Sequence, residues 1–387
     1  MAFEVARLSR IPVPRYWTIN GRFLTQGVTG VQRYAREIVN ALDDLLAEGH
    51  PLGHQLSLEL LAPVSDVAMP QLKSIGTRRA GPLAGHLWEQ LSLPVHARGG
   101  ILSLCNTSTI LRRRQIVCIH DVNTMMFPQS YSRVFRALYR IALPAIGRNA
   151  LLVATVSNYS ADQIKRLGWA AASKLRIMPD GYEHVRRWAP RHSSITKAVA
   201  GLDTIVVLGS LAPHKNINLL LRSAQELASH GLKIAVVGDL DRKVFHRAKV
   251  EARSDGVVWL GGISDDELAA LLKDSLCLAF PSLAEGFGLP PLEAMALGCP
   301  VVVSDRASLP EVCGEAALYA SADDSQEWLK CFLALRNDQG LRDRQIEKGL
   351  ARVGRYQWRT SAQLYLQAMA YIDAITAASG LCLTEES

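Results

Sequence analysis

The chain has few of the features that mark secreted, membrane-spanning or nucleic-acid-binding proteins. Its seven cysteines show no paired spacing, which argues against a disulfide framework and favours reduced, buried thiols. No window of about 18 residues is apolar and free of charge, and the first ten residues lack the apolar core of a signal peptide, so we expect neither a membrane span nor secretion. Aromatic residues make up 6%, and no helix-turn-helix, zinc-finger or RNA-recognition pattern is present, so nucleic acid is not an expected partner.

Charge is distributed unevenly along the 387 residues. Residues 1–180 contain 21 Lys and Arg against 11 Asp and Glu, whereas residues 181–387 contain 22 against 25. A basic first half indicates an anionic lipid or an anionic substrate as partner, although ordinary solvated charge is the alternative.

Short apolar runs alternate with longer amphipathic segments, which predicts an α/β protein. Because the runs are rich in Val, Ile and Leu without alternation, we expect strands of parallel sheets that helices cover on both faces. The length favours two doubly wound domains, with a boundary where a strand-like run ends in Pro-Asp-Gly. We therefore predict domains over 1–180 and 181–357, and a final helix over 358–387. The apolar runs are 57–64, 115–121, 150–157, 204–210, 233–239, 256–261, 276–282 and 300–305.

The stretch PSLAEGFGLPPLEAMALGCPVVVSD, residues 281–305, reads as a loop, a helix and the next strand. Ligands of open α/β sheets bind beyond the carboxyl ends of the strands, so Glu285 and the glycine turn at 286–288 lie where a ligand is expected. Hydrogen bonds to a phosphate would be donated by the backbone N–H groups of Gly288, Leu289 and Leu292, because Pro290 and Pro291 have no N–H group. Glu293 could accept hydrogen bonds from sugar hydroxyls. Taken singly, both glutamates are equally consistent with solvated carboxylates near a helix N-terminus.

Together, the residues EGFGLPPLEAMALGCPVV resemble the E-x7-E signature of family 4 glycosyltransferases, retaining enzymes of the GT-B fold. That fold has two Rossmann-like domains facing a central cleft. The resemblance implies that Glu285 contacts the sugar of a nucleotide-sugar donor and that Glu293 holds the ribose. It also implies donor contacts from the turn and the following residue, that is, from Gly286, Phe287, Gly288 and Leu289.

The loop VLGSLAPHKNINLLL, residues 207–221, is similar to the loop of this family that reaches the donor diphosphate. The resemblance places Lys215 on the diphosphate. Many members carry an arginine where this chain has Ser210, so the neutralisation of the diphosphate differs here. His214 would compensate weakly.

Two segments of the N-terminal half also resemble the family. GRFLTQGVTGVQRYAREIVNAL, residues 21–42, is similar to its glycine loop and first helix, which implies Gly27 and Gly30 at the donor and Arg33 toward the acceptor, with Thr29 or Gly30 as helix cap. Solvated arginines on a surface helix are the alternative.

QIVCIHDVNTMMFP, residues 115–128, is similar to the family's strand that ends in His-Asp. The resemblance implies His120 beside the reacting sugar, and Asp121 in the acceptor site or orienting the imidazole. With Glu285 and Lys215, His120 completes the expected catalytic set.

The resemblance implies retaining transfer of a sugar to a hydroxyl of a saccharide, with the departing phosphate as base and no protein nucleophile. Mannose and a lipid-linked acceptor of bacterial polysaccharide assembly are the favoured substrates, because the Gly-Phe-Gly-Leu-Pro-Pro form resembles mannosyltransferases. No cofactor is implied, and no metal is expected although residues 239–241 imitate a D-x-D motif. A nucleotide-sugar hydrolase or epimerase, or a non-catalytic sugar-nucleotide-binding protein, are the alternatives.

Residues 130–148, SYSRVFRALYRIALPAIGR, combine four arginines with Tyr131, Phe135 and Tyr139. This composition suits a helix lying on anionic lipid, although a packed helix with a basic outer face has the same pattern. We expect a cytoplasmic protein in peripheral contact with the inner face of the cytoplasmic membrane.

Overall fold

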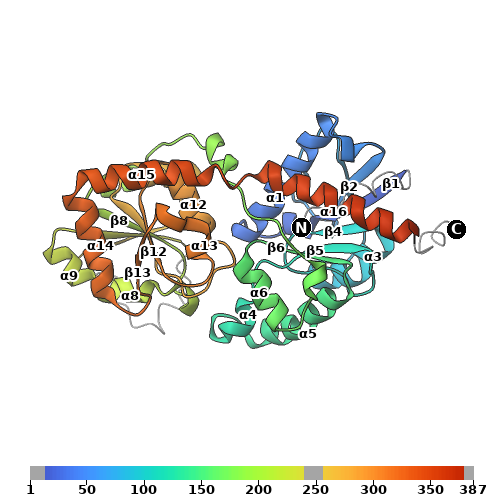
Figure 1. Ribbon diagram of the computed structural model, residues 1–387, viewed down its shortest axis with the longest axis horizontal. Coiled ribbons are helices and arrows are strands. Elements are labelled where there is room, and N and C mark those ends of the chain that lie inside the picture. Colours follow the sequence, from blue (N-terminus) through green and yellow to red (C-terminus); the bar gives the residue numbers. More distant parts are fainter. Residues whose placement is uncertain (1–13, 239–255, 379–387) are drawn as a thin grey trace. The chain divides into compact units, whose positions relative to one another are not determined.

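The computed structural model describes residues 14–238 and 256–378, which form two compact units (Figure 1). The first unit takes in the chain up to Val122, the segment Arg133–Asp180 and the chain from Trp358 onward. The second unit consists of Asn123–Ser132 and Gly181–Gln357. The sequence assigned the short segment Asn123–Ser132 to the N-terminal domain. It belongs to the second unit because Ser130 and its neighbours pack on the loop that contains His214.

The first unit contains a seven-stranded sheet in which all neighbouring strands are parallel. The strand order is β3-β2-β1-β4-β5-β6-β7, so the direction of winding reverses between β1 and β4. Such a reversal leaves two loops that diverge at the carboxyl edge of the sheet. The strands are β1 (Arg15–Asn20), β2 (Leu56–Ala62), β3 (Gly76–Arg79), β4 (Gly100–Ser103), β5 (Gln115–Cys118), β6 (Leu152–Thr155) and β7 (Leu175–Ile177).

Helices from both ends of the chain cover this sheet. Figure 1 shows the C-terminal helix α16, in red, lying beside α1, in blue. The Tyr34 and Tyr365 hydroxyls, one on each helix, are 2.9 Å apart and buried. The helices are α1 (Gly30–Ala47), α2 (Gly85–Leu87), α3 (Leu93–His96), α5 (Arg133–Asn149), α6 (Asn158–Arg166) and α16 (Trp358–Ala378), with a π-helical turn, η4 (Trp88–Ser92), between α2 and α3.

A buried carboxylate fixes α16 to the sheet. Asp373 is fully buried and accepts hydrogen bonds from Arg15 Nε at 2.6 Å and from Trp17 Nε1 at 2.9 Å, both on β1. It also accepts one from Arg114, just before β5, at 2.7 Å. Breaking one side of a buried ion pair commonly costs about 3–5 kcal/mol, so α16 is an integral part of the first unit.

The second unit contains a six-stranded parallel sheet of order β10-β9-β8-β11-β12-β13. Together the two parallel sheets confirm the predicted α/β class. The strands are β8 (Thr204–Leu208), β9 (Lys233–Val237), β10 (Val257–Gly261), β11 (Cys277–Phe280), β12 (Val301–Ser304) and β13 (Leu318–Ala320). The helices are α4 (Asn123–Met126), α7 (Ser194–Val199), α8 (Ile217–Arg222), α9 (Ala224–Ser229), α11 (Asp265–Lys273), α12 (Leu289–Ala296), α13 (Leu309–Cys313), α14 (Ser325–Asn337) and α15 (Gln339–Val353), with short 3-10 turns η5 (Pro128–Ser130), η7 (Glu183–Arg187), η8 (Pro213–Lys215) and η9 (Gly314–Ala316).

Candidate functional site

In the second unit, the strand order reverses between β8 and β11. β9 and β10 lie on one side of this point, and β12 and β13 lie on the other. Ligands of open α/β sheets bind at such a switch point, beyond the carboxyl ends of the two strands. The loop 209–216 after β8 and the loop 281–288 after β11 are therefore the expected ligand-binding loops of this unit.

The two loops are joined by an ion pair between predicted site residues. Lys215 Nζ lies 2.8 Å from Glu285 Oε1, and their side chains are 26% and 12% exposed. The ammonium also lies 5.5 Å from the centroid of the Phe280 ring at the end of β11. Both side chains remain partly open to solvent. The ammonium could therefore bind an anionic ligand group in place of the carboxylate, and the carboxylate could bind a hydrogen-bond donor in place of the ammonium. Sequence reasoning gave these residues separate roles and did not predict their pairing.

The turn after Glu285 has a conformation that favours glycine. Gly288 has φ +112° and immediately precedes α12, and a Cβ atom there would lie 2.8 Å from Leu309 Cδ2. The Ser308 hydroxyl bonds to the carbonyl oxygens of Glu285 at 3.0 Å and Phe287 at 2.7 Å, which fixes the turn. The Phe287 ring is buried, so this residue can offer a ligand only its backbone.

The start of α12 has fewer backbone donors than expected. The Leu292 N–H donates to Gly288 O at 3.4 Å, so the expectation that it serves a phosphate is wrong. The N–H groups of Gly288 and Leu289 precede the first intrahelical bond of α12 and point outward from a helix N-terminus.

Glu293 lies in the second turn of α12 and has a partner that sequence reasoning did not identify. His184 Nε2 is 2.8 Å from Glu293 Oε1, and both residues are buried. The Trp188 ring packs edge-on against the imidazole, with centroids 5.4 Å apart. The contact with His184 thereby fixes the orientation of the carboxylate.

In the loop after β8, Lys215 is the expected cation, and neither Ser210 nor His214 adds a positive charge. Ser210 is exposed, and its hydroxyl oxygen accepts a long 3.4 Å bond from the Ala212 N–H within the loop itself. His214 is buried against Ser130, with Nδ1 2.9 Å from the Ser130 hydroxyl, and stacks on Tyr131. Burial, with a smaller effect of the Lys215 charge, lowers the pKa of His214 to about 4. His214 is therefore neutral at pH 7, and the expectation that it compensates for a missing arginine is wrong.

In the first unit, His120 follows β5 and is buried and neutral. Its Nε2 lies 2.8 Å from the Leu104 carbonyl oxygen, so Nε2 carries the hydrogen and Nδ1 has the lone pair. The ring packs edge-on against Tyr34, and the backbone N–H donates to Asn106. Burial lowers the pKa of His120 to about 4. The Leu104 carbonyl orients the imidazole, which is one of the two roles that the sequence left open for Asp121.

The glycine loop of the first unit follows β1 at the switch point of that sheet. Thr29 is the N-cap of α1 and forms a capping box with Gln32. Gly27 and Gly30 have ordinary φ angles, and a Cβ atom at either would meet nothing within 4 Å. The fold itself therefore does not require glycine at these positions. Arg33 lies in the first turn of α1, where its N–H donates to Thr29 O at 2.8 Å.

Residues 191–352 match the family model described as "Glycosyl transferases group 1". The chain is a glycosyltransferase. It is 29% identical over 294 residues to the O-antigen chain mannosyltransferase RfbU of Salmonella typhimurium, covering 74% of this chain and 79% of the relative. It is 28% identical to the O-antigen chain mannosyltransferase B of Escherichia coli, covering 63% and 67%.

Solved structures share the fold of this glycosyltransferase at low sequence identity. Sucrose-phosphate synthase from Thermosynechococcus elongatus superposes with a TM-score of 0.67 at 19% identity, over 92% of this chain and all of that one. Anabaena HepE, solved in complex with UDP and glucose, gives 0.62 at 18% identity, over 92% and 99%. These likenesses confirm the GT-B fold class. The matched family region contains Lys215, Glu285 and Glu293.

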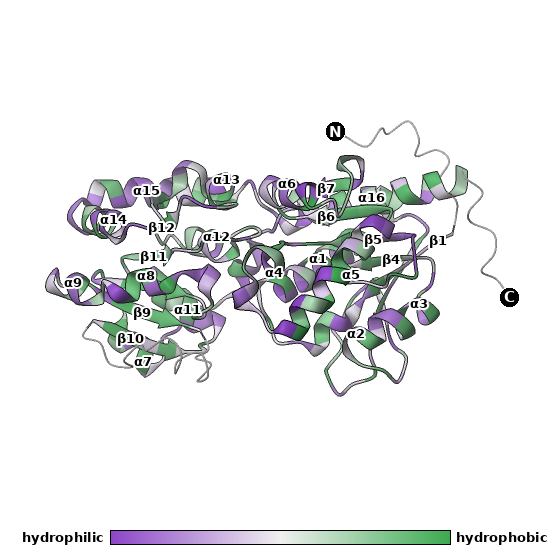
Figure 2. Ribbon diagram, turned by 90° about the horizontal axis from the view of Figure 1, so that it is seen from below, coloured by the Kyte–Doolittle hydropathy of each residue, from purple (hydrophilic) through white to green (hydrophobic). Residues whose placement is uncertain are grey.

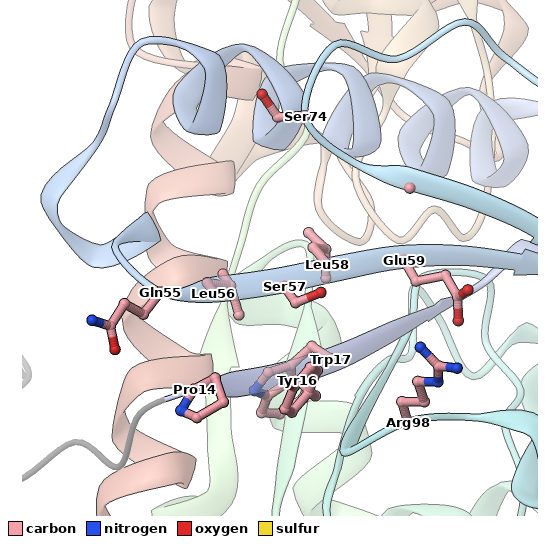
Figure 3. A pocket seen from close by; sticks show the side chains of 11 residues that line it. Pro14, Tyr16, Trp17, Gln55, Leu56, Ser57, Leu58, Glu59, Ser74 and Arg98 are labelled. Atoms are coloured by element: carbon pink, nitrogen blue, oxygen red, sulfur yellow. The ribbon is translucent and has the colours of Figure 1, made fainter.

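A pocket elsewhere in the glycosyltransferase does not belong to the candidate site. It has a volume of about 610 Å³ and lies at the amino-terminal ends of β1 and β2, among Tyr16, Ser57 and Glu59 (Figure 3). Ligands of parallel sheets bind at the opposite, carboxyl edge. Within the described ranges, no cluster of three His, Cys, Asp or Glu residues could hold a metal ion. The D-x-D imitation at 239–241 lies outside the described residues.

Acidification is expected to destabilise the first unit of the glycosyltransferase through His120. Its pKa is about 4 when folded and about 6.5 when unfolded, so the unfolded state binds more protons between these values. The stabilising contribution is complete above about pH 6.5 and is lost as the pH falls toward 4. Between pH 7.5 and pH 5 we expect a loss of about 2 kcal/mol in the free energy of unfolding.

Urea unfolding of His120→Asn at the two pH values would measure this contribution. The variant should lose less stability on acidification than the wild type, whereas His54→Asn, at an exposed histidine of the same unit, should follow the wild type. Equal acid sensitivity of wild type and His120→Asn would contradict the assignment.

Substitution of the two loop glycines should separate stability from activity. Because both Cβ positions are open, and because Ala restricts the unfolded chain more than Gly and also favours the helical position of Gly30, Gly27→Ala and Gly30→Ala should unfold at or slightly above the wild-type temperature. If the open space admits a ligand, we expect kcat/KM to fall about tenfold or more, since a methyl group would occupy it. Thermal unfolding and initial rates measure the two effects, and unchanged rates would remove the glycines from the site.

Proposed function

We propose that the protein transfers mannose from a nucleotide-sugar donor, with GDP-mannose as the first candidate, to a hydroxyl of a lipid-linked saccharide in bacterial polysaccharide biosynthesis. The transfer retains the anomeric configuration and uses no cofactor or metal. The names of the two O-antigen mannosyltransferases above, both of which align over most of their length, support this choice of sugar and acceptor.

The observation that carries the proposal is the Lys215–Glu285 ion pair at the switch point. A diphosphate brings negative charge to Lys215 and releases Glu285 from the ammonium. The carboxylate then becomes an acceptor for sugar hydroxyls, next to the Gly286–Gly288 backbone. Glu293, oriented by His184, binds the ribose hydroxyls.

During transfer, the bond between the anomeric carbon and the diphosphate oxygen breaks, and a bond from that carbon to the acceptor oxygen forms on the same face. The proton of the acceptor hydroxyl passes to the departing phosphate. As its bond to the sugar breaks, the diphosphate acquires a new negative charge, which Lys215 and the N–H groups at the start of α12 stabilise before the proton is taken up. Glu285 stabilises the positive charge that develops on the sugar.

Groups of the first unit are also proposed to contact the substrates. Neutral His120 offers the sugar the Nδ1 lone pair as a hydrogen-bond acceptor, because Nε2–H is committed to Leu104. The open space at Gly27 and Gly30 admits the donor phosphate, and Asp121 and Arg33 bind the acceptor. A neutral imidazole serves as a positioning group and not as a source of positive charge.

A lipid-linked acceptor requires the protein to work at a membrane surface. Within the described part of the chain, no helix is long and apolar enough to cross a bilayer. The proposed location is the cytoplasm, with peripheral contact between the first unit and the anionic inner face of the cytoplasmic membrane. The arginine-rich helix α5 supports this contact.

Incubation with a panel of nucleotide sugars tests the proposal. Release of GDP from GDP-mannose that depends on an added saccharide acceptor, with an α-linked product by NMR, is the expected result. Turnover without an acceptor would instead identify a hydrolase or epimerase. Binding without turnover of any donor would identify a sugar-nucleotide-binding protein.

A further inference from the structure

Helix α5 exposes a stripe of aliphatic residues. Val134 is 80% exposed, Leu138 41% and Ile141 74%, and their spacing places them on one helix face. Tyr139, one of the three aromatic residues noted in this segment, is buried in the unit and stacks on Phe135. The outer face of the helix therefore presents aliphatic residues and not this ring.

A second helical segment presents a matching stripe. Along α2, the π-helical turn and α3, three apolar residues recur every four positions, and Leu87, Leu91 and Val95 are 63%, 53% and 77% exposed. The same segment buries Trp88 and Leu93 against the sheet, so its outer apolar residues are not needed for the core. Their exposure therefore has no explanation in the packing of the unit.

The two segments are neighbours in the fold. The His86 ring, at the start of the second segment, packs edge-on against Tyr139 of α5 with centroids 5.8 Å apart. At the other end, Ile110 N donates to Gln90 Oε1, and Asn149 at the end of α5 donates to Ile110 O at 2.9 Å. Figure 2 shows α2 and α3 alongside α5.

Ile110, which bonds to both helical segments, and the next residue, Leu111, are apolar and exposed as well. The resulting surface, called here the apolar face, contains nearly half of the large apolar side chains that are exposed in the described chain. Isolated exposed apolar residues are ordinary, but a contiguous group indicates a binding surface. The apolar face consists of Leu87, Leu91, Val95, Ile110, Leu111, Val134, Leu138 and Ile141.

The charge around the apolar face has one sign. Residues 85–114 and 131–149 contain a single acidic residue, Glu89, which is buried and paired with Arg22. Exposed arginines flank the aliphatic stripes on α5 and in the adjoining loop; they are Arg113, Arg133, Arg140 and Arg148. A protein partner would have to supply an acidic rim around an apolar centre, whereas an anionic bilayer supplies both over a broad area.

We propose that the apolar face inserts into the interfacial layer of an anionic membrane, with α5 and the α2–α3 segment lying in the membrane plane. This inference rests on the membrane contact in the proposed function and names the residues and the mode of binding. Aliphatic side chains enter the boundary between headgroups and acyl chains, while the arginines contact lipid phosphates. Binding therefore has an apolar component that salt does not screen, in addition to an electrostatic one.

Sedimentation with vesicles separates these components. The probes are vesicles of phosphatidylcholine and of phosphatidylcholine mixed with phosphatidylglycerol, each at low and high salt. The apolar variant is Leu91→Gln/Leu138→Gln, and the charge variant is Arg133→Gln/Arg140→Gln. Leu350→Gln and Arg344→Gln, at exposed positions of the second unit, are the matched controls.

We expect the wild type to bind mixed vesicles and to retain part of this binding at high salt. The apolar variant should bind at least about tenfold more weakly, and salt should remove what remains. The charge variant should lose about tenfold on mixed vesicles and little on phosphatidylcholine alone. The controls should bind like the wild type.

Wild-type affinity of the apolar variant, or no vesicle binding by the wild type, would overturn the inference. So would a dimer in analytical ultracentrifugation that the apolar variant dissociates, because the face would then bind a second copy. Titration with GDP and UDP distinguishes this inference from the proposed function. Every variant should bind nucleotide like the wild type. If the vesicle results are as expected but the protein shows no nucleotide binding or no sugar transfer, only the proposed function is refuted.

Discussion

Replacement of Glu285 by glutamine should lower kcat about 100-fold or more, with nucleoside diphosphate binding unchanged or slightly tightened. In the structure Glu285 and Lys215 are 2.8 Å apart, so the carboxylate competes with a diphosphate for the same ammonium. Removing its charge frees Lys215 for the diphosphate. The same change removes the group that stabilises positive charge on the sugar, a contact that strengthens only as the reaction proceeds.

Lys215→Met should act on both parameters. Without the ammonium, nucleoside diphosphate affinity and kcat should each fall, because the cation binds the diphosphate in the ground state and stabilises its additional charge in the transition state. Glu315→Gln, at a 93% exposed glutamate of the same unit, is the control and should leave both unchanged. Isothermal titration and steady-state kinetics separate the two readouts. If Glu285→Gln abolished diphosphate binding while Glu293→Ala left it intact, the assigned roles would be reversed.

The second large effect should come from the buried His184–Glu293 pair. Glu293→Ala is expected to weaken nucleoside diphosphate binding about 10- to 100-fold and to raise the donor KM, with a smaller effect on kcat. A ribose contact exists in both the ground state and the transition state, so its loss affects binding first. His184→Leu should act in the same direction, because the carboxylate loses the donor that orients it.

A comparison of ligands identifies the ribose as the cause. A 2′,3′-dideoxynucleoside diphosphate lacks the hydroxyls, so its affinity should be nearly equal for wild type, Glu293→Ala and His184→Leu. The double variant should resemble Glu293→Ala alone, because the two residues act as one unit. His192→Leu, which removes a partly buried histidine 2.9 Å from Asp274, is the matched control. If both ligands lost affinity equally in His184→Leu, the histidine would serve only the fold.

The strands that the sequence predicted and those it missed differ in a physical way. Each of the eight apolar runs contains a strand, because a parallel strand covered on both faces needs only apolar residues to be buried. β1 was not predicted, since it contains Arg15 and Asn20, and no local pattern indicates that Asp373 would neutralise Arg15. β3 and β13 lie at sheet edges, where β3 has the polar sequence GTRR and β13 has only three residues, so neither forms a recognisable apolar run.

The candidate site was predictable where residues adjacent in sequence form it. Glu285 and Glu293 lie on a single strand–loop–helix unit, so their spacing alone indicated their shared location. His184 was not predictable, because it lies far from Glu293 in sequence and an isolated histidine has no periodic pattern. The outer face of α5 was not predictable, because the sequence gives no measure of how the Tyr139 ring would pack against His86 on another segment.

The contacts of Asp373 also determine when the first unit can complete its folding during synthesis. The first unit requires α16, yet the ribosome makes α16 only after all of Gly181–Gln357 has emerged. The second unit can complete its sheet while the first still lacks a buried carboxylate and the helix that covers α1. The usual order, in which the N-terminal domain folds first, is thereby inverted. Until α16 has been synthesised, Arg15, Trp17 and the surface of α1 that α16 covers lack their partners.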